Sequence, residues 1–410
     1  MVKNNIIGRL LGVSMTCVLV LSGCTGDKTQ TVSLQEMNTS EQEENTSLIY
    51  EEEEIPKADF TNASIVMVGD VLLHKRVSES GLMEDGSYNY DHLFKNVKDD
   101  IESADLALVN QEVILGGIEL GLSGYPTFNG AYEVGDSLVD AGFDVILHAT
   151  NHALDKGKKG LLNCMHFWNE NYPDIGVLGI HETEEEAEDI YITEVNGINI
   201  AILNYTYGTN GIALPQDMPY AVDIWDEEAI KDDVKAAKEE ADFIIVCPHW
   251  GTEYELDATK DQRDKAQFLA DLGVNLVIGT HPHVIEPVEW LTGESGNKTL
   301  VYYSIGNFIN ATSGTGKGTA ARMVGAMAKV NITKDDDSTR ISDYEVEPLV
   351  THLVNGRGMI TTYRLNDYTQ DMALENKMSR QDAEFSLDYC KDLCSRVFGE
   401  LYNEKESSSN

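Results

Sequence analysis

The sequence contains a series of apolar runs that each end in Asp, Asn, Glu or His. Runs of this kind, rich in Val, Ile and Leu and hydrophobic throughout, are typical of strands buried in a parallel sheet. The carboxyl ends of parallel strands meet at one edge of the sheet, so we expect the polar side chains at these positions to converge there. The runs and their polar ends cover residues 64–70, 106–112, 145–152, 243–249 and 276–283.

Helical patterns separate these runs, so strands and helices alternate along the chain from Phe60 onward. Alternation with nearly continuous apolar strands indicates an α/β fold with a mainly parallel sheet covered on both faces. Further strands are expected to begin near residues 176, 198 and 300. The helices are expected over 91–103, 132–142, 157–171, 227–241 and 260–272.

Two local patterns depart from this alternation. The Asn196-Gly197 pair predicts a tight hairpin between strands at 190–195 and 198–205. After residue 315 the pattern changes to two alternating strands, over 321–333 and 341–351. A final amphipathic helix is expected over 380–398.

The N-terminus has the pattern of a processing signal. Lys3 and Arg9 precede an apolar stretch that is too short for a spanning helix, and this stretch ends in a sequence that resembles a bacterial lipobox, with Cys24 as its cysteine. We therefore expect a signal peptide over 1–23, a lipid on Cys24 and a protein anchored at the extracytoplasmic face of the cell membrane. The alternative is an ordinary secreted protein with a chance cysteine.

Composition divides the remainder of the chain. Residues 24–58 are polar and acidic, and predict a flexible linker. We assign 59–355 to one large domain and 356–410 to a helical C-terminal extension. Cys164 and Cys247 lie in apolar surroundings and are interpreted as buried thiols, whereas Cys390 and Cys394, one helical turn apart, are either free or joined by a strained bridge.

The charge of the chain limits its partners. With 70 acidic against 30 basic residues, the formal net charge is −40. Nucleic acid is excluded as an expected partner, because no basic face is available to neutralise phosphates. An anionic substrate would need local positive charge to enter a site, and a bound metal could supply it.

The residues at the strand ends are of the types that bind divalent metals. Imidazole together with carboxylate suits Mn, Fe or Zn, and does not distinguish among them. The two histidines that flank Pro282 after a buried strand have no packing rationale. The candidate ligands are Asp70, His74, Glu112, Asn151, His249, His281 and His283.

Several short motifs carry a family resemblance. They are Gly69-Asp70, Asn110-Gln111-Glu112, the stretch 151–157 that begins Asn151-His152, His249-Trp250-Gly251-Thr252-Glu253, Gly279-Thr280-His281-Pro282-His283 and Ser304-Ile305-Gly306-Asn307-Phe308. In this order, over about residues 60–310, they resemble the capsule-synthesis CapA family, also called poly-γ-glutamate biosynthesis proteins. That family belongs to the calcineurin-like metallophosphoesterase superfamily.

The resemblance implies a four-layer metallophosphatase-like β-sandwich flanked by helices, with two divalent metal ions at the strand ends. Asp70 and His283 would bind the first ion, and Glu112 would bridge the two. Asn151, His249 and His281 would bind the second. His74 follows Asp70 by four residues, whereas superfamily members place a histidine two residues on, so its role as a ligand stays open.

The resemblance also implies a catalytic pair beside the metals. A pair of metals suits in-line displacement at a phosphoester, and His152 would protonate the leaving group or stabilise the transition state. Asp155, three residues on, would fix the tautomer of His152. Trp250 is interpreted as a wall of the site. Each assignment has a structural alternative: a hydrogen-bonded histidine, a solvated acid at Glu112 or a helix N-cap at Asp70.

Three functions fit these observations. The first is a metal-dependent hydrolase of phosphoesterase type, acting on a capsule or envelope polymer or on a small phosphoester. The second is a non-catalytic accessory protein for assembly or export of an anionic capsule polymer, possessing the same fold and working in a membrane complex. The third is a binding protein that uses the cleft for a small ligand. Fold analogy alone does not decide among them.

Overall fold

The computed structural model describes residues 60–336, 338–356 and 358–403. The expected signal peptide, the lipidation site Cys24 and the acidic linker to residue 58 lie outside the described residues. Across the described ranges, no helix is both long enough and apolar enough to cross a membrane.

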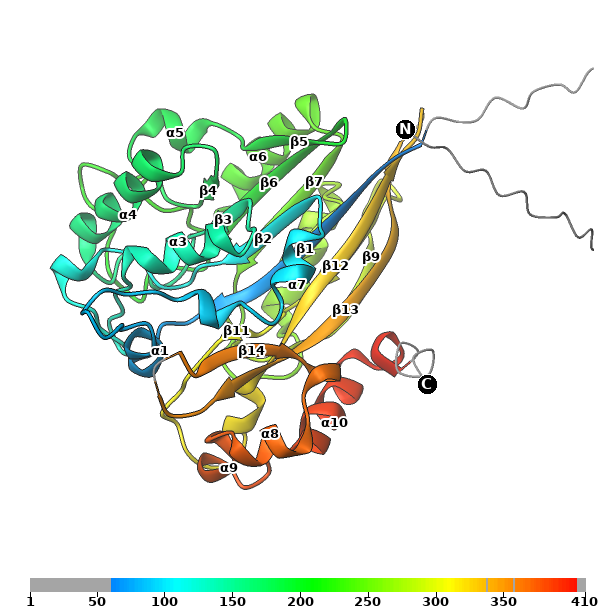
Figure 1. Ribbon diagram of the computed structural model, residues 1–410. Coiled ribbons are helices and arrows are strands. Elements are labelled where there is room, and N and C mark those ends of the chain that lie inside the picture. Colours follow the sequence, from blue (N-terminus) through cyan, green and yellow to red (C-terminus); the bar gives the residue numbers. More distant parts are fainter. Residues whose placement is uncertain (1–59, 337, 357, 404–410) are drawn as a thin grey trace, which may run out of the picture. The chain divides into compact units, whose positions relative to one another are not determined.

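The first sheet has eight strands, and the N-terminal strand β1 (Thr61–Val71) runs through its middle (Figure 1). On one side of β1 lie β2 (Leu106–Asn110), β3 (Val145–Leu147) and β4 (Gly176–Leu178), all parallel to it. On the other side lie the antiparallel strands β12 (Val324–Lys334), β13 (Thr339–Leu353) and β14 (Ile360–Arg364). The short β11 (Asn307–Ile309) pairs in parallel with the end of β1.

The second sheet has six strands in the order β5-β6-β7-β8-β10-β9. Its central strands β6 (Ile198–Thr206), β7 (Phe243–His249), β8 (Leu276–Ile278) and β10 (Lys298–Tyr302) are parallel. The edges are β5 (Ile192–Val195) and β9 (Val288–Thr292), each antiparallel to its neighbour. The hairpin between β5 and β6 is confirmed, with Asn196 and Gly197 at φ 52° and 78°.

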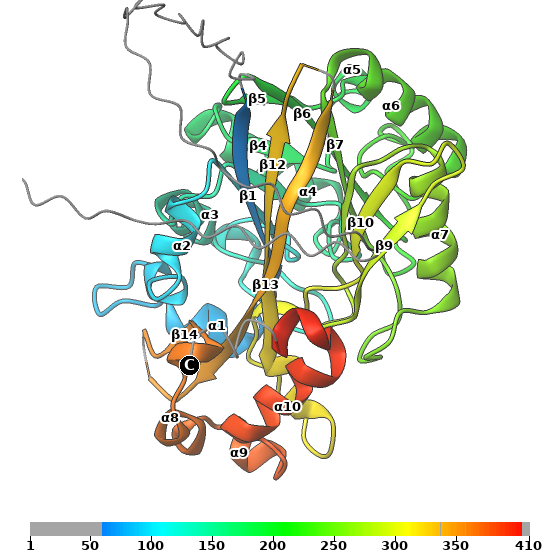
Figure 2. The same cartoon turned by 90° about the vertical axis from the view of Figure 1, so that its right-hand side faces the viewer.

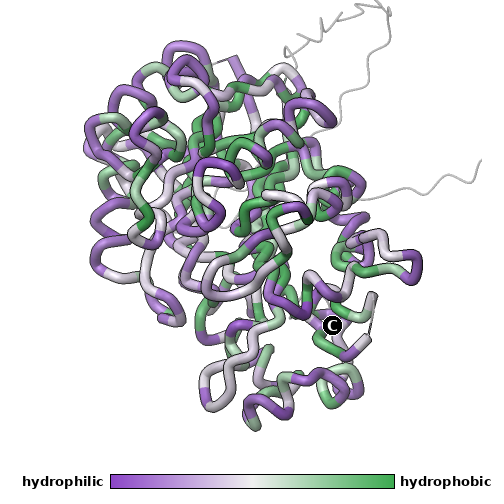
Figure 3. The backbone as a smooth tube through the Cα atoms, turned by 90° about the vertical axis from the view of Figure 1, so that its left-hand side faces the viewer, coloured by the Kyte–Doolittle hydropathy of each residue, from purple (hydrophilic) through white to green (hydrophobic). Residues whose placement is uncertain are grey.

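The two sheets pack face to face, because the strands of the second sheet are apolar on both sides. In β6, Ile200 belongs to the core shared with the first sheet, whereas Leu203 packs among residues of α6 (Glu227–Glu240) and α7 (Lys260–Asp271). The sulfur atoms of Cys247 and Met67 lie 3.7 Å apart across the interface between the sheets. Hydropathy along the backbone shows the same division, with apolar strands inside and polar outer turns (Figure 3).

Helices cover the outer face of each sheet. On the first sheet these are α2 (Lys98–Glu102), α3 (Tyr132–Asp140) and α4 (Gly157–Asn171), and on the second they are α6 and α7. Figure 2 shows the layers, with α2 and α3 on one side of the sheets and α6 and α7 on the other. The expected fold class, a four-layer α/β sandwich flanked by helices with a small C-terminal extension, is confirmed. Two short helices, α1 (Lys75–Ser80) and α5 (Glu184–Glu188), were not expected.

The sequence predicted a helical C-terminal extension, but the extension also contains a strand. Its first element is strand β14, which pairs with β13 and completes the first sheet. The helix expected over 380–398 is divided after α9 (Met378–Gln381), because the backbone of Asp382 is extended. The Asp382 carboxylate accepts a hydrogen bond from the Ala320 N–H. Helix α10 (Leu387–Phe398) follows α8 (Gln370–Glu375) and α9, and buries the thiols of Cys390 and Cys394, which are not bridged to each other.

Candidate metal centre

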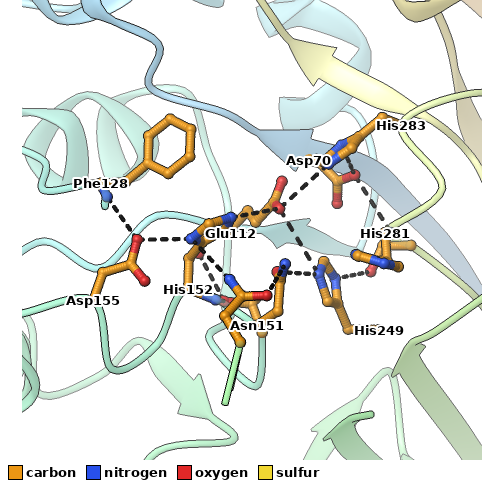
Figure 4. A network of polar contacts seen from close by, with 12 residues as sticks. Asp70, Glu112, Phe128, Asn151, His152, Asp155, His249, His281 and His283 are labelled. Atoms are coloured by element: carbon orange, nitrogen blue, oxygen red, sulfur yellow. Dashed lines mark hydrogen bonds and ion pairs between the residues drawn. The ribbon is translucent and has the colours of Figure 1, made fainter. Parts of the chain in front are cut away.

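The polar ends of the strands meet at one place between the two sheets. Asp70 lies at the end of β1 and Glu112 two residues beyond β2. His249 ends β7, and His281 and His283 follow β8. The side chains point toward one another around Glu112 (Figure 4). The convergence expected from parallel strands is therefore present.

The side chains form two groups that share one carboxylate. Candidate ligand atoms of Asp70, Glu112 and His283 all lie within 4.8 Å of one another, and so do those of Glu112, His249 and His281. All five residues are buried. A carboxylate common to two groups of ligands is the arrangement by which a protein holds two metal ions side by side.

Glu112 is a fully buried acid that faces three histidines. Neither of its carboxylate oxygens has a hydrogen-bond partner among the described residues. Oε1 lies 3.6 Å from Nε2 of His283 and 3.9 Å from Nε2 of both His152 and His249. Burial raises the pKa of Glu112 well above its ordinary value. A buried carboxyl group without hydrogen bonds is costly, and a bound cation would remove that cost. The donor set therefore fits a divalent metal.

Two asparagines hold the first group in place. Nδ2 of Asn110 donates to Oδ1 of Asp70 at 2.8 Å, and Oδ1 of Asn307 lies 3.1 Å from Nδ1 of His283. Nδ1 of His283 is also 3.2 Å from Oδ2 of Asp70. Burial lowers the pKa of His283, but Glu112 and Asp70 outweigh burial and raise the pKa to about 10.

The backbone of this region is unusual at both histidines. His281 has φ 97° and His283 has φ 58°, values that residues other than glycine rarely adopt. Such strained residues persist where the surrounding structure holds them, and they cluster at functional sites. The end of β1 is equally constrained, because a Cβ on Gly69 would lie 1.8 Å from the carbonyl oxygen of Gly306.

His249 is the centre of the second group. Its Nε2 lies 2.9 Å from Oδ1 of Asn151, and its Nδ1 lies 3.0 Å from Oγ1 of Thr280. Burial lowers the pKa values of His249 and His281 well below the ordinary value, which favours the neutral imidazole that binds metals. Nδ1 of His281 has no hydrogen-bond partner within the described ranges. Asn151 thus presents its side-chain oxygen to the second group.

His152 and Asp155 lie at the edge of the two groups. Nδ1 of His152 is 2.7 Å from Oδ2 of Asp155, which also accepts a hydrogen bond from the Phe128 N–H at 2.6 Å. The ring of Phe128 lies edge-on to that of His152, with centroids 4.7 Å apart. The His152 ring is thereby held with Nε2 toward Glu112 (Figure 4).

His74 does not lie among the candidate ligands, and Trp250 does not line the site. The structure places His74 outside both groups, near Phe128 and lining a cavity beside His283. Burial lowers the pKa of His74 to about 4. Trp250 is not a wall of the site: it belongs to the core between the second sheet and α7, and its Nε1 donates to the Tyr303 carbonyl at 2.9 Å. Trp250 follows His249, the last residue of β7, so its side chain points to the opposite face of the sheet.

Sequence reasoning did not predict the contacts of several residues that support the centre. Asn110 and Asn307 lie inside recognised motifs, but their spacing does not say which ligand each one contacts. Asn210, whose Nδ2 lies 3.4 Å from Nδ1 of His152, comes from a loop after β6 that carries no ligand pattern. Phe128 also comes from a loop distant in sequence. Tertiary structure alone brings Asn210 and Phe128 to the site.

Solved structures align with this chain only at low similarity. A NAD nucleotidase from Haemophilus influenzae aligns with a TM-score of 0.45 and 13% identity, over 85% of this chain and 61% of that one. The calcineurin-like phosphoesterase YfkN from Bacillus subtilis aligns with a TM-score of 0.41 and 13% identity, over 85% of this chain and all of that one (100%).

Sequence comparison gives more specific relatives. The PGA biosynthesis protein CapA of Bacillus subtilis (strain 168) is 34% identical over 173 residues, which are 42% of this chain and 44% of that protein. The capsule biosynthesis protein CapA of Bacillus anthracis is 26% identical over 254 residues, or 60% of this chain and 59% of that protein. The chain thus spans about half the length of these curated relatives. The model of the family described as bacterial capsule synthesis protein PGA_cap matches residues 64–312, which include every candidate metal ligand. The chain belongs to this capsule synthesis family.

Proposed function

We propose that the chain is a divalent-metal-dependent hydrolase of phosphoesterase type that takes part in capsule polymer biosynthesis. The observation that carries this proposal is the buried carboxylate of Glu112, which lies between two groups of ligands and has no hydrogen-bond partner among the described residues. Asp70, Glu112 and His283 would hold one ion, and Glu112, Asn151, His249 and His281 the other. When bound, such a pair activates water and stabilises the charge that develops on a phosphoryl oxygen.

The chain itself supplies the proton for the leaving group. Asp155 accepts from Nδ1 of His152, so the ring carries its donor N–H on that side and is oriented by it. When His152 is protonated, Nε2 is the nitrogen free to donate toward the centre. His152 is 7% exposed, so little water competes for that position.

The polymer is proposed from the relatives. Both named CapA proteins are described by capsule or PGA biosynthesis. We propose an anionic capsule polymer such as poly-γ-glutamate, or a phosphoester intermediate of its synthesis, as the substrate class. The same names favour a second candidate, a non-catalytic accessory protein for assembly or export of that polymer, because neither name refers to hydrolysis.

Membrane attachment belongs to the same proposal. A lipid on Cys24 would hold the domain at the extracytoplasmic face, where a capsule polymer is assembled. Replacing Cys24 by alanine should then move the protein from the membrane fraction to the soluble fraction of cells. A variant that remains in the membrane fraction would argue against the lipid anchor.

Turnover separates the two candidates. The full-length chain, reconstituted with Mn, Fe or Zn, should hydrolyse a chromogenic phosphodiester, and His152→Ala should remove that activity. His166→Ala is the matched control, because His166 is an exposed histidine paired with Glu182. Metal binding without turnover on phosphodiesters or phosphomonoesters would favour the accessory role.

A further inference from the structure

A cavity of about 190 Å³ opens directly beside the candidate metal centre. His283 and Asn307 of the centre form part of its wall. The remainder comes from Leu72, His74, Tyr125, Tyr254, Arg322, Asn310 and the stretch from Thr312 to Gly314. Because His283 belongs to both places, a substrate that reacts at the centre would extend its neighbouring group into this cavity.

The cavity contains a cation that forms no ion pair within the described ranges. Arg263, Arg340 and Arg364 each pair with carboxylates, whereas Arg322 has none in that part of the chain. Its Nε is buried without a hydrogen-bond partner among the described residues. In a chain of formal net charge −40, a half-buried guanidinium without a carboxylate is unusual. A buried donor of this kind calls for an anionic partner.

Arg322 is held in position although its guanidinium nitrogens form no hydrogen bonds with other described residues. Its backbone carbonyl accepts hydrogen bonds from Nδ2 of Asn307 at 2.9 Å and of Asn310 at 3.1 Å. Its Cζ lies 3.5 Å from the centroid of the Tyr254 ring, a cation–π contact. A guanidinium fixed in this way loses little conformational freedom when a ligand binds.

We propose that this cavity is a carboxylate-binding subsite, in which Arg322 receives a carboxylate that the substrate carries beside its reacting group. The planar guanidinium fork matches the two oxygens of a carboxylate. The subsite rests on the proposed function for its place beside the reacting group, and it selects substrates with acidic repeating units over neutral ones.

Binding of a small dicarboxylate tests the subsite without turnover. The full-length chain, freed of metal and chelator, is titrated with glutarate by saturation-transfer NMR, with glutaramide as its uncharged counterpart. The variants are Arg322→Met, which removes the charge, and Arg322→Lys, which retains the charge without the fork. Arg340→Met is the control, because Arg340 lies opposite Thr333 in the pairing of β12 with β13, at the end of β12 away from Arg322. Inorganic phosphate, followed by ³¹P line broadening, is the second anion.

Wild type and Arg340→Met should bind glutarate and not glutaramide. Arg322→Met should weaken glutarate binding by at least about tenfold, with Arg322→Lys between the two, because charge-assisted hydrogen bonds are lost. Equal binding by wild type and folded Arg322→Met and Arg322→Lys, or none by wild type, would overturn the subsite. Arg322-dependent binding of phosphate in place of glutarate would overturn the carboxylate assignment. Turnover together with glutarate binding that does not depend on Arg322 would support the hydrolase and overturn the subsite. Arg322-dependent glutarate binding without turnover would support the subsite and argue against the hydrolase.

Discussion

Oδ2 of Asp155 lies 2.7 Å from Nδ1 of His152 and accepts the backbone N–H of Phe128 at 2.6 Å. One carboxylate oxygen therefore joins the loop of Phe128 to the imidazole that faces Glu112. In such a chain of contacts, Asp155 orients His152 without touching either group of candidate ligands.

This relationship predicts separate effects on turnover and on metal content. His152→Ala should lower kcat by about 10²–10⁴-fold, the usual contribution of a general acid. Asp155→Asn should lower kcat less, because the amide still accepts from Phe128 but no longer favours the N–H on Nδ1. Metal content, measured by mass spectrometry, should stay at the wild-type level in both. Loss of metal in Asp155→Asn would show that Asp155 supports the ligands themselves.

Asn307 predicts an effect on metal affinity. Its Oδ1 contacts the ring of His283, and its Nδ2 donates to the carbonyls of His283 and Arg322. Asn307→Ala should weaken metal binding by about 10–100-fold, as loss of a group that orients a metal ligand does. Asn310→Ala is the control, because Asn310 donates to the Arg322 carbonyl but does not contact His283. Competition with a chelating dye measures both, and equal affinities would refute the orienting role of Asn307.

The sequence predicted the order of the elements well. Every expected strand from β1 to β10 lies where its apolar run lies, because a buried parallel strand needs such a run. The convergence of the candidate ligands was equally predictable, since each lies at the end of a strand or within a few residues after it. Strands β9, β11 and β14 were missed, because β9 and β14 are five-residue edge strands and β11 has only three residues.

The contacts around the ligands were not predictable from spacing. Asn210, Phe128 and Arg322 come from loops and a short helical turn that carry no motif. Their positions depend on how the two sheets face each other, a property of the whole packing. His74 shows the reverse error, because a strand-end histidine at a ligand-like position lines the neighbouring cavity.

Glu286 predicts a dependence of stability on pH. Burial raises its pKa to about 8, although Nε2 of Gln262 donates to it at 2.6 Å. The unfolded carboxyl has its ordinary pKa of 4.5. Between these values the folded protein holds a proton that the unfolded chain releases, so stability falls as pH rises through this window.

Glu286→Gln removes that titration and retains an oxygen for Gln262. The difference in Tm between this variant and wild type should therefore increase in favour of the variant from pH 5 to pH 8. Thermal unfolding at several pH values measures it. Glu119→Gln, at an exposed acid, should show no such trend. A Tm difference for Glu286→Gln that is constant with pH would contradict the raised pKa.

The close packing around Gly69 predicts that one added methyl group lowers the stability of the protein. A Cβ at this position would lie 1.8 Å from the Gly306 carbonyl oxygen, so β1 and β11 would have to separate beside Asp70. Gly69→Ala should destabilise the protein by about 1–3 kcal/mol, the usual cost of overpacking. At Gly208 an added Cβ meets nothing within 4 Å, and Gly208→Ala should be within about 0.5 kcal/mol of wild type. Denaturant titration compares them, and equal stabilities would disprove the close approach.

Metal stoichiometry tests the shared role of Glu112 most directly. The purified full-length chain, its Glu112→Gln variant and the exposed-acid control Glu119→Gln are reconstituted with Mn, Fe or Zn and measured by mass spectrometry. Since Glu112 belongs to both groups of ligands, wild type and the control should each hold about two ions per chain, and Glu112→Gln should lose both. A wild-type chain that binds no metal, or a Glu112→Gln variant that binds as much as wild type, would contradict a metal centre built around Glu112.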